Sequence, residues 1–516
     1  MISKFFYFLY MVRGVFAVVI YSSVFLIFAL VAYGSWLGYR GVELPEADFA
    51  MVSGGVGRAD FVVFILFDGA SAEVFQKVSE QWTRVGMLLP WGSSVLPSYS
   101  GPARASILSG APPAVHGVVS NEGVFRVSVD NLVEEARRRG YVVVNVGDVL
   151  VESLFGVEAV PVEEGAGQGA LALEAGRVLL RRHLGEGRRV FMWITVNDVD
   201  IMGHKAGGLS AEYNASVRNH VLLISRFLDE VSDLLPRGLV VVLNDHGFKR
   251  GGHHGGGEEA VMSTFMYVAG LGVRPGVCGA RFLLIDVAPT VAMLLGWDLP
   301  RHSLGRPLTE CFGDPGGYAA ASERQRRQLA SRLESRYGTS EINALFTDMW
   351  WIRLPLVAVA FIPPLYLLRR APRRTFIPAA LHVASFAAFY AYAVRISTFS
   401  DIYSFGEVVT KIALTALAAS IPAGLATAKM ATSRRDATAT LIHAYLAVAT
   451  LGLAAASTFL IPYGPVVTFP NPPWDLAVKY FVALLSAAFS GLVGVPTAVA
   501  AALAMYKNPP RLYPPA

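Results

Sequence analysis

Carboxylate and imidazole side chains recur in this chain at spacings that suit a site for divalent metal ions. Asp200 and His204 stand four residues apart, and His254 lies in a glycine-rich segment that can fold over a small ion. The full set of candidate ligands is Asp68, Asp200, His204, Asp245, His246 and His254. Nitrogen and oxygen donors in this proportion suit two zinc ions, with Mn²⁺ as the alternative metal. A pair of ions serves displacement at phosphorus, because it can stabilise both the attacking and the leaving oxygen.

Ser100 is the candidate nucleophile for such a centre. It ends a loop and stands near the start of a predicted short helix, whose first turn contains Pro102. The helix dipole and the free amides at that end favour an anionic group, and a bound metal would lower the pKa of the Ser100 hydroxyl. Arg104, one turn later, is expected to hold a non-bridging phosphoryl oxygen. Taken alone, Ser100 would also fit as a plain helix cap, and only the metal ligands favour the nucleophile.

The candidate ligands follow predicted strands of an α/β domain. Short Val-rich runs alternate with helical stretches between residues 40 and 347, which favours a mostly parallel central sheet covered by helices. Strands are predicted at Phe61–Phe67, Tyr141–Val146, Val190–Val196, Leu239–Leu243 and Phe265–Val268, and helices at Asn131–Arg139, Ala170–His183, Ala211–Leu235, Ala288–Leu295 and Arg324–Arg336. Asp68, Asp200 and Asp245 each come shortly after a strand, and ligands of open α/β sheets bind beyond the carboxyl ends of the strands. We therefore expect these side chains to meet at one edge, whereas Asp148 is expected to be only a helix cap.

Several motifs, taken in order, resemble the alkaline phosphatase superfamily, and most closely its type I phosphodiesterase/nucleotide pyrophosphatase branch. They are Asp68-Gly69, the segment from Pro97 to Ser100 that continues to His116-Gly117, the D-x-x-G-H at 200–204, the D-H-G at 245–247 and the H-G at 254–255. The resemblance covers residues 60–310 and implies an alkaline phosphatase-like fold.

The same resemblance implies a role for each residue. One metal ion would be bound by Asp200, His204 and His254, and the other by Asp68, Ser100, Asp245 and His246. Ser100 would attack phosphorus and form a covalent phospho-serine intermediate, which water or an acceptor alcohol then resolves. Asp198, Asn244, Lys249 and His253 would support the ligands or bind substrate. Ala103 offers no polar group to a phosphate, so Arg104 or Lys249 is expected to supply that contact.

Two alternatives stay open. The run from Ser100 to Arg104 also resembles the sulfatase signature, in which a Cys or Ser is oxidised to formylglycine. Sulfatases generally hold one metal ion and lack the ligands that His204 and His254 would provide here. The other alternative is a transporter or membrane scaffold with a degenerate outer domain, which would require the ligand set to be broken.

The composition predicts a membrane protein. Of the 516 residues, 53% are hydrophobic and 16% charged, and the mean hydropathy is +0.46. The uncharged run from Gly14 to Tyr39 is long enough for a retained signal anchor. Five further apolar segments follow at 349–368, 375–394, 412–428, 438–462 and 480–506. We expect a first span within 1–39, a catalytic domain at 40–347 and a membrane domain at 348–516.

The Lys and Arg residues in the short flanks predict the orientation. They gather on the side shared by both termini, for example at Arg373, Arg374, Arg434 and Arg435. Because basic residues resist translocation, both termini should be cytoplasmic and the catalytic domain extracytoplasmic. The layout also resembles that of GPI ethanolamine phosphate transferases. The five spans after the catalytic domain are more than a simple anchor needs. They suggest either a lipid-linked phosphate ester as substrate or a role in assembly.

The charge balance excludes nucleic acid as a partner. The pI is near 9.1 and the net charge +5, but residues 40–347 carry 34 acidic and 29 basic side chains. The basic excess therefore belongs to the membrane flanks. Two cysteines, Cys278 and Cys311, are equally compatible with a disulfide and with free thiols. The sequence does not indicate an oligomeric state.

Overall fold

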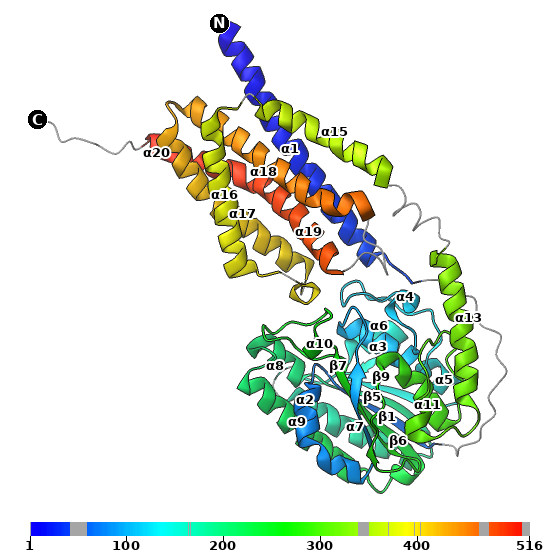
Figure 1. Cartoon of the computed structure of the whole chain (residues 1–516). Helices are drawn as coiled ribbons and strands as arrows, with labels where there is room; N and C mark the ends of the chain where they lie inside the picture. Colours follow the sequence, from blue (N-terminus) through cyan, green and yellow to red (C-terminus); the bar gives the residue numbers. More distant parts are fainter. Residues whose placement is uncertain are drawn as a thin grey trace, which may run out of the picture. The chain divides into compact units, whose positions relative to one another are not determined.

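The structure, a computed structural model, describes residues 2–41, 59–163, 165, 167–338, 350–369, 371–396, 398–402, 404–463 and 474–507. The chain divides into two compact units (Figure 1). One unit is Tyr39–Thr339, and the other combines Met1–Gly38 with Ser340–Ala516. The domain boundary expected at 347/348 lies outside the described residues.

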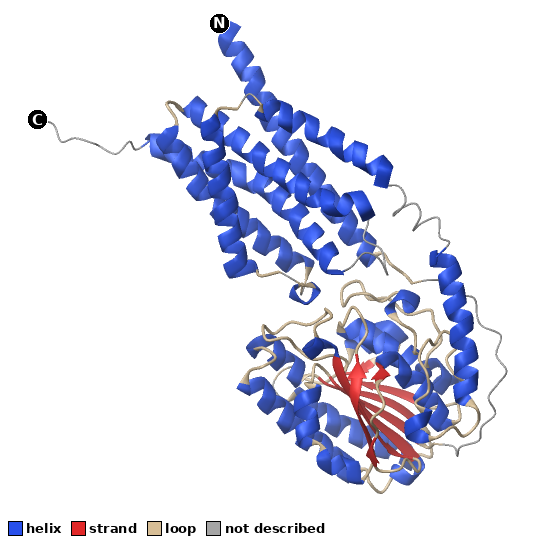
Figure 2. Ribbon diagram, viewed as in Figure 1, coloured by secondary structure: helices blue, strands red, loops and turns tan. Residues whose placement is uncertain are grey.

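The unit Tyr39–Thr339 is built on one mixed, mostly parallel sheet, drawn red in Figure 2. The strands are β1 (Phe61–Phe67), β2 (Met87–Ser93), β3 (Val142–Val146), β4 (Ala159–Val160), β5 (Val190–Val196), β6 (Gly238–Leu243), β7 (Ser263–Gly270), β8 (Gly276–Val277) and β9 (Phe282–Leu283). Their order is β4-β3-β5-β1-β6-β7-β2-β8, and β9 pairs with β2. Only β7 runs antiparallel to its neighbours, β6 and β2. The expected fold class is therefore confirmed.

Helices cover both faces of this sheet (Figure 2). They are α2 (Ala72–Val78), α3 (Ser100–Ser109), α4 (Pro113–His116), α5 (Leu132–Arg138), α6 (Val149–Phe155), α7 (Gln168–Gly185), α8 (Asp198–Ala206), α9 (Ala211–Glu230), α10 (Glu259–Met262), α11 (Val287–Leu295), α12 (Thr309–Phe312) and α13 (Tyr318–Gly338). Alternate residues of β1 enter two hydrophobic clusters, Val62 with Phe64 on one face and Val63 with Ile65 on the other. Helices α3, α5, α6 and α11 contribute to the first cluster, and α2, α7 and α9 to the second.

The three central strands end at the same level. Phe61 of β1 pairs with Val190 of β5 and with Gly238 of β6, and near the other end Leu66 pairs with Thr195 and Leu243; both strand pairings are parallel. Every residue of these strands is buried, as expected for parallel strands covered on both faces. The residues that follow β1, β5 and β6 therefore emerge side by side at the carboxyl edge of the sheet.

Some predicted elements differ from those in the structure. Strand β2 and helix α8 were not expected, because β2 is interrupted by Pro90 and Gly92, and the D-x-x-G-H segment contains a glycine. Helix α9 ends at Glu230 instead of Leu235, and α13 begins at Tyr318 instead of Arg324. The central strands, by contrast, match within two residues.

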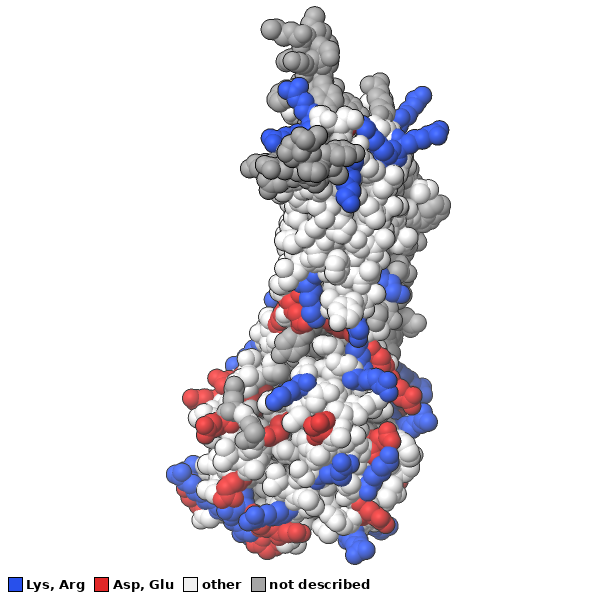
Figure 3. Space-filling view, turned by 90° about the vertical axis from the view of Figure 1, so that its left-hand side faces the viewer, with Lys and Arg blue, Asp and Glu red and all other residues white. Residues whose placement is uncertain are grey.

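The other unit consists of apolar helices. They are α1 (Ile2–Leu37), α15 (Trp350–Leu368), α16 (Phe376–Phe389), α17 (Phe405–Met430), α18 (Arg434–Tyr463), α19 (Trp474–Phe489) and α20 (Val495–Lys507), with short π-helical turns at Tyr390–Val394 and Ser490–Gly494. In the described part of the chain, six helical segments are long and apolar enough to span a membrane, as expected. In Figure 3 these helices present a band without charged side chains, and basic side chains gather at one end of it.

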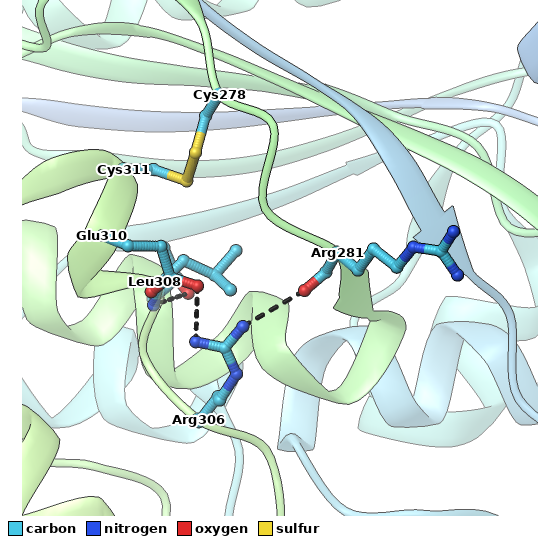
Figure 4. Close-up of a disulfide and its surroundings, with 7 residues drawn as sticks. Cys278, Arg281, Arg306, Leu308, Glu310 and Cys311 are labelled. Carbon is cyan, nitrogen blue, oxygen red and sulfur yellow. Dashed lines mark hydrogen bonds and ion pairs between the residues drawn. A yellow bond between two sulfur atoms is a disulfide. The ribbon is translucent and has the colours of Figure 1, made fainter.

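A disulfide joins Cys278 to Cys311 (Figure 4). It links the segment after β8 to α12, across 33 residues of sequence. Next to it, Arg306 forms an ion pair with Glu310 and donates a hydrogen bond to the carbonyl of Arg281. These bonds hold together the segment from β8 to α12 in the unit Tyr39–Thr339. The two cysteines therefore form a disulfide in the structure and are not free thiols.

Candidate active site

The predicted ligands converge at the carboxyl edge of the three central strands. Asp68 directly follows β1, and Asp245 with His246 follows β6 after a single residue. Asp200 and His204 lie one turn apart on α8, which begins just after β5, so both point to the same side of that helix. His254 comes from the glycine-rich loop after β6. The convergence expected from the sequence is therefore present.

Asp68, Asp245 and His246 form one compact group with Ser100. Their ligating atoms lie within 4.8 Å of one another, and all three residues are buried. His246 Nε2 is 3.6 Å from Asp68 Oδ1, 3.6 Å from Asp245 Oδ2 and 3.3 Å from Ser100 Oγ. In a tetrahedral site with bonds of about 2.0–2.1 Å, neighbouring ligand atoms lie roughly 3.3–3.5 Å apart. The spacing is therefore close to that of a zinc site.

Asp200, His204 and His254 form a second group beside the first. His204 Nε2 lies 3.6 Å from Asp200 Oδ2 and 3.2 Å from His254 Nε2, and His254 Nε2 lies 3.8 Å from Asp200 Oδ1. His246 adjoins this group as well, because its Nε2 is 3.9 Å from Asp200 Oδ1 and its ring stacks on that of His254. His246 thus lies between the two groups of ligands.

Backbone carbonyls fix which nitrogen of each imidazole faces the centre. The Nδ1 atoms of His204, His246 and His254 lie 3.1, 3.1 and 3.2 Å from the carbonyl oxygens of Gly252, Gly247 and Ser98 respectively. A carbonyl oxygen only accepts, so each Nδ1 must carry the hydrogen. All three Nε2 atoms then present lone pairs to the centre, as metal-binding histidines do.

Two carboxylate oxygens at this centre lack a hydrogen-bond partner. In the described part of the chain, the buried atoms Asp68 Oδ1 and Asp200 Oδ1 accept no hydrogen bond. An unpaired buried carboxylate oxygen costs about 1–3 kcal/mol or more, whereas a divalent ion beside it would satisfy it. Asp68 Oδ1 lies 3.6 Å from His246 Nε2, and Asp200 Oδ1 lies 3.9 Å and 3.8 Å from the Nε2 atoms of His246 and His254. The residues therefore fit a pair of divalent ions.

The ionisation of the site also reflects its burial. Burial, followed by the charge of Asp68, raises the pKa of both Asp200 and Asp245 well above the ordinary value for an aspartate. Burial lowers the pKa of His246 to about 4 and that of His254 well below its usual value. Burial therefore favours the neutral imidazole of His246 and His254, and protons compete with a cation for the carboxyls of Asp200 and Asp245.

Ser100 occupies the expected place as the first residue of α3. It is followed by Gly101, whose N–H donates to Asn121 Oδ1 at 2.7 Å. Asn121 is exposed, and in the described part of the chain no hydrogen bond uses its Nδ2. Asn121 could not be predicted from the sequence, since a single asparagine in a loop carries no motif. The side-chain amide of Asn121 bonds to the residue that follows the candidate nucleophile. It therefore supplies the polar group that Ala103 lacks.

Arg104 does not lie where a phosphoryl clamp should be. Its Nη2, Nε and Nη1 atoms bond to Asp68 Oδ2 at 2.6 Å, Asp148 Oδ2 at 2.6 Å and Asp245 Oδ2 at 3.1 Å. Burial alone would lower the pKa of Arg104, but these carboxylates raise it well above its ordinary value. The expected contact with substrate is therefore corrected: Arg104 braces two ligand carboxylates from behind.

Asp148 does more than the helix cap expected of it. Its Oδ1 accepts from the N–H groups of Leu150 and Val151, which is the cap of α6. Its Oδ2 accepts from Arg104, from Trp193 Nε1 at 3.1 Å and from Thr195 Oγ1 at 2.7 Å. A buried network therefore runs from β5 through Asp148 and Arg104 to the ligands.

The four supporting residues expected near the ligands serve different purposes. Asp198 accepts from the amides of Gly167 and Gly169 and pairs with His220, which anchors the start of α7. Asn244 is fully buried, donates to the carbonyl of Ala70 and accepts from the N–H of Phe265, so it ties β1 and β7 to β6. Lys249 and His253 are joined by a backbone hydrogen bond in the glycine-rich loop. Among the described residues, the two compact groups of ligating atoms are Asp68 with Asp245 and His246, and Asp200 with His246 and His254, so neither contains His204 or His253.

Residues 62–154 match the family described as type I phosphodiesterase / nucleotide pyrophosphatase. This segment of the chain is similar to phosphodiesterases. The matched segment contains Asp68, Ser100, Arg104 and Asn121. The resemblance to this branch, expected from the motifs, is therefore confirmed for the first part of the domain.

Curated relatives match part of this chain. GPI ethanolamine phosphate transferase 2 of Schizosaccharomyces pombe is 27% identical over 171 residues, which cover 29% of this chain and 23% of that protein. GPI ethanolamine phosphate transferase 3 of the same yeast is 32% identical over 122 residues, which cover 22% of this chain and 13% of that protein. The matches thus span less than a quarter of the length of these relatives.

Solved structures align with about half of this chain. Murine ectonucleotide pyrophosphatase/phosphodiesterase 5, an inactive variant in complex with AMP, aligns at 12% identity and a TM-score of 0.39, covering 47% of this chain and 96% of that one. Wild-type alkaline phosphatase PafA aligns at 11% identity and a TM-score of 0.42, covering 50% of this chain and all of that one.

Proposed function

We propose that this chain is a membrane-bound, metal-dependent enzyme that acts on phosphodiesters, with Ser100 as its nucleophile. One observation carries the proposal. His204 and His254 bring their Nε2 atoms within 3.2 Å of each other beside Asp200, whose buried Oδ1 has no hydrogen-bond partner among the described residues. A divalent cation bound there would be ligated by both imidazoles and would satisfy that oxygen. The similarity to phosphodiesterases and to GPI ethanolamine phosphate transferases supports the same chemistry.

Two divalent ions would be held by the seven predicted ligands. Asp200, His204 and His254 would hold one, and Asp68, Ser100, Asp245 and His246 the other. The ions would supply Lewis acidity toward the phosphoryl oxygens and lower the pKa of the Ser100 hydroxyl. Both Zn²⁺ and Mn²⁺ accept such ligands.

The residues of the chain would then carry out an ordinary double displacement. Ser100 Oγ bonds to phosphorus while the ester bond to the leaving alcohol breaks, and the hydroxyl proton of Ser100 ends on that alcohol. The Ser100 N–H and the Asn121 carboxamide would donate to the non-bridging oxygens, because the Gly101 N–H already donates to Asn121 Oδ1 and the Ala103 N–H to the Tyr99 carbonyl. Water or an acceptor alcohol attacks the phospho-serine and regenerates Ser100.

The similarity to ethanolamine phosphate transferases favours transfer to an alcohol over hydrolysis. We propose that the catalytic unit is extracytoplasmic. The Cys278–Cys311 disulfide supports this placement, because disulfides persist in oxidising compartments. An antibody against the catalytic unit should label intact cells or spheroplasts, and labelling only after permeabilisation would overturn the placement.

The proposed chemistry is tested with nitrophenyl esters and the full-length protein in detergent. We expect hydrolysis of a nitrophenyl phosphodiester that is lost with a chelator and restored by Zn²⁺ or Mn²⁺. Ser100→Ala should be inactive yet still bind metal, whereas Ser109→Ala, on the same helix, should stay active because its hydroxyl bonds to backbone groups, the Ala105 carbonyl and the Ala111 N–H. An active Ser100→Ala protein would refute the nucleophile.

The same measurements separate the alternatives. Cleavage of an aryl sulfate, together with a formylglycine mass at residue 100, would establish the sulfatase alternative. Failure of the wild-type protein to retain any divalent ion would favour a membrane scaffold. A phosphoethanolamine diester with an added primary alcohol distinguishes transfer from hydrolysis by the product formed.

A further inference from the structure

Phe248 lies at the centre of the three candidate metal-binding imidazoles. Its side chain is 2% exposed, two residues after His246 in the chain. Its ring centroid lies 4.9 Å from that of His204, 5.7 Å from that of His246 and 5.2 Å from that of His254, with interplanar angles of 89°, 73° and 78°. One phenyl ring thus makes edge-to-face contacts with imidazoles from α8, from the end of β6 and from the glycine-rich loop.

Two motif glycines make room for this ring. A Cβ atom on Gly69 would lie 2.7 Å from Phe248 Cε2, and one on Gly203 would lie 2.4 Å from the same atom. Both distances are far inside van der Waals contact, so a larger residue at either position would displace the ring. Gly69 follows Asp68, and Gly203 precedes His204. The glycines of the D-G and D-x-x-G-H motifs therefore allow the ligand-bearing segments to close on Phe248.

Tyr213 of α9 holds the other side of the ring. Its ring centroid lies 5.7 Å from that of Phe248 at an interplanar angle of 73°, and its hydroxyl donates to the carbonyl of Gly69 at 2.6 Å. Tyr213 is completely buried. Phe248 is thus enclosed between a fixed tyrosine and the three histidines, and has no space in which to turn.

We infer that Phe248 is a positioning residue that sets the planes of the three imidazoles before any ion binds. The inference rests on the proposed metal-dependent function. A hydrogen bond from Nδ1 fixes one atom of each imidazole, but the ring can still swing about that atom. An edge-to-face contact with a buried aromatic ring restricts this swing. Groups that orient ligands from behind contribute about 10–100-fold to metal affinity.

The test compares Phe248→Leu with Phe191→Leu in the full-length protein. Phe191 is equally buried, at 1% exposure, but lies at the amino end of β5, where its ring packs on Phe64 and Trp297. Both substitutions remove the same atoms from a core and should lower the melting temperature of the metal-free protein by similar amounts. The readouts are the Co²⁺ and Zn²⁺ affinities, measured by chelator competition, and the d–d absorption bands of bound Co²⁺.

We expect Phe248→Leu to weaken metal binding about 10–100-fold and to change the Co²⁺ bands, whereas Phe191→Leu keeps both at wild-type values. Gly203→Ala gives a second route, because its helical backbone tolerates alanine while its Cβ would push the ring aside. It should weaken metal binding in the same direction. If Phe248→Leu and Gly203→Ala both bind metal with wild-type affinity and spectra, the positioning role is overturned, but the proposed metal-dependent function is not. A wild-type protein that binds no Co²⁺ would overturn the proposed function and this inference with it.

Discussion

Arg104 Nη2 donates to Asp68 Oδ2 at 2.6 Å, while the other oxygen of Asp68 faces His246 without a hydrogen-bond partner among the described residues. The same carboxylate is therefore held on one side by a permanent cation and left open on the other. This division of roles explains why a buried arginine is placed directly behind a site that attracts cations. The guanidinium fixes the ligand, and the free oxygen remains for the ion.

Replacing Arg104 should destabilise the metal-free protein strongly. Arg104→Met leaves Asp68, Asp148 and Asp245 buried without their cation, and breaking such a buried pair costs about 3–5 kcal/mol. Arg181→Met is the matched control, because Arg181 is 41% exposed and pairs with Asp233 at the surface, where such a pair contributes about 0–1 kcal/mol. Thermal unfolding checks the difference. Equal melting temperatures for the two variants would contradict the bracing role.

Removing the Asn121 carboxamide should slow catalysis without affecting metal binding. Asn121 is held beside Ser100 by the N–H of Gly101. Loss of one preorganised donor to a developing phosphoryl charge typically lowers kcat by about 10²–10³-fold. We therefore expect Asn121→Ala to reduce kcat on a phosphodiester by roughly this factor. Metal content is the control, and an Asn121→Ala enzyme with wild-type kcat would remove Asn121 from the site.

Metal affinity should weaken as the pH falls. Burial and the charge of Asp68 raise the pKa of Asp200 and Asp245, so the metal-free site carries protons on these carboxyls that the ion must displace. His246, with its pKa lowered to about 4, is already neutral and competes little. Binding should release protons, and the apparent affinity should rise with pH. Zn²⁺ titrations at several pH values, with proton release measured in weakly buffered solution, test this; affinity independent of pH between about 5 and 8 would contradict it.

Reduction of the disulfide should lower the stability of the catalytic unit. The Cys278–Cys311 bond closes a loop with a sequence separation of 33 residues, and closing a loop of this size stabilises a fold by roughly 3–4 kcal/mol in the chain-entropy description. A reductant, or Cys311→Ser, should therefore lower the melting temperature while leaving the metal ligands in place. Alkylation of both cysteines in the unreduced protein, detected by mass spectrometry, would show that the bond does not form.

The sequence was sufficient to predict the central strands and the ligands, for a physical reason. Strands such as Phe61–Phe67 and Val190–Val196 are continuous apolar runs, because both of their faces are covered, and such runs are readily recognised. The ligands follow them directly. The convergence of Asp68, Asp200 and Asp245 could therefore be expected from strand order alone.

Other parts of the site could not be predicted in this way. Arg104 looked like a substrate clamp because the sequence does not reveal that three carboxylates surround it. Phe248 and Asn121 act through contacts with residues distant in sequence, and neither residue type signals chemistry by itself. Likewise, Asp148 looked like a simple cap, since the bonds of its second oxygen to Arg104 and Thr195 depend on the fold.

The pairing of β5, β1 and β6 also determines whether a metal centre can exist. Phe61 stands opposite both Val190 and Gly238, and each ligand is counted from the end of its strand. Slippage of one strand by a single residue would displace its ligand by about 3.3 Å, more than the length of a metal–ligand bond of about 2 Å. The hydrophobic side chains that prevent such slippage, although distant from the candidate ligands, therefore determine how precisely those ligands are placed.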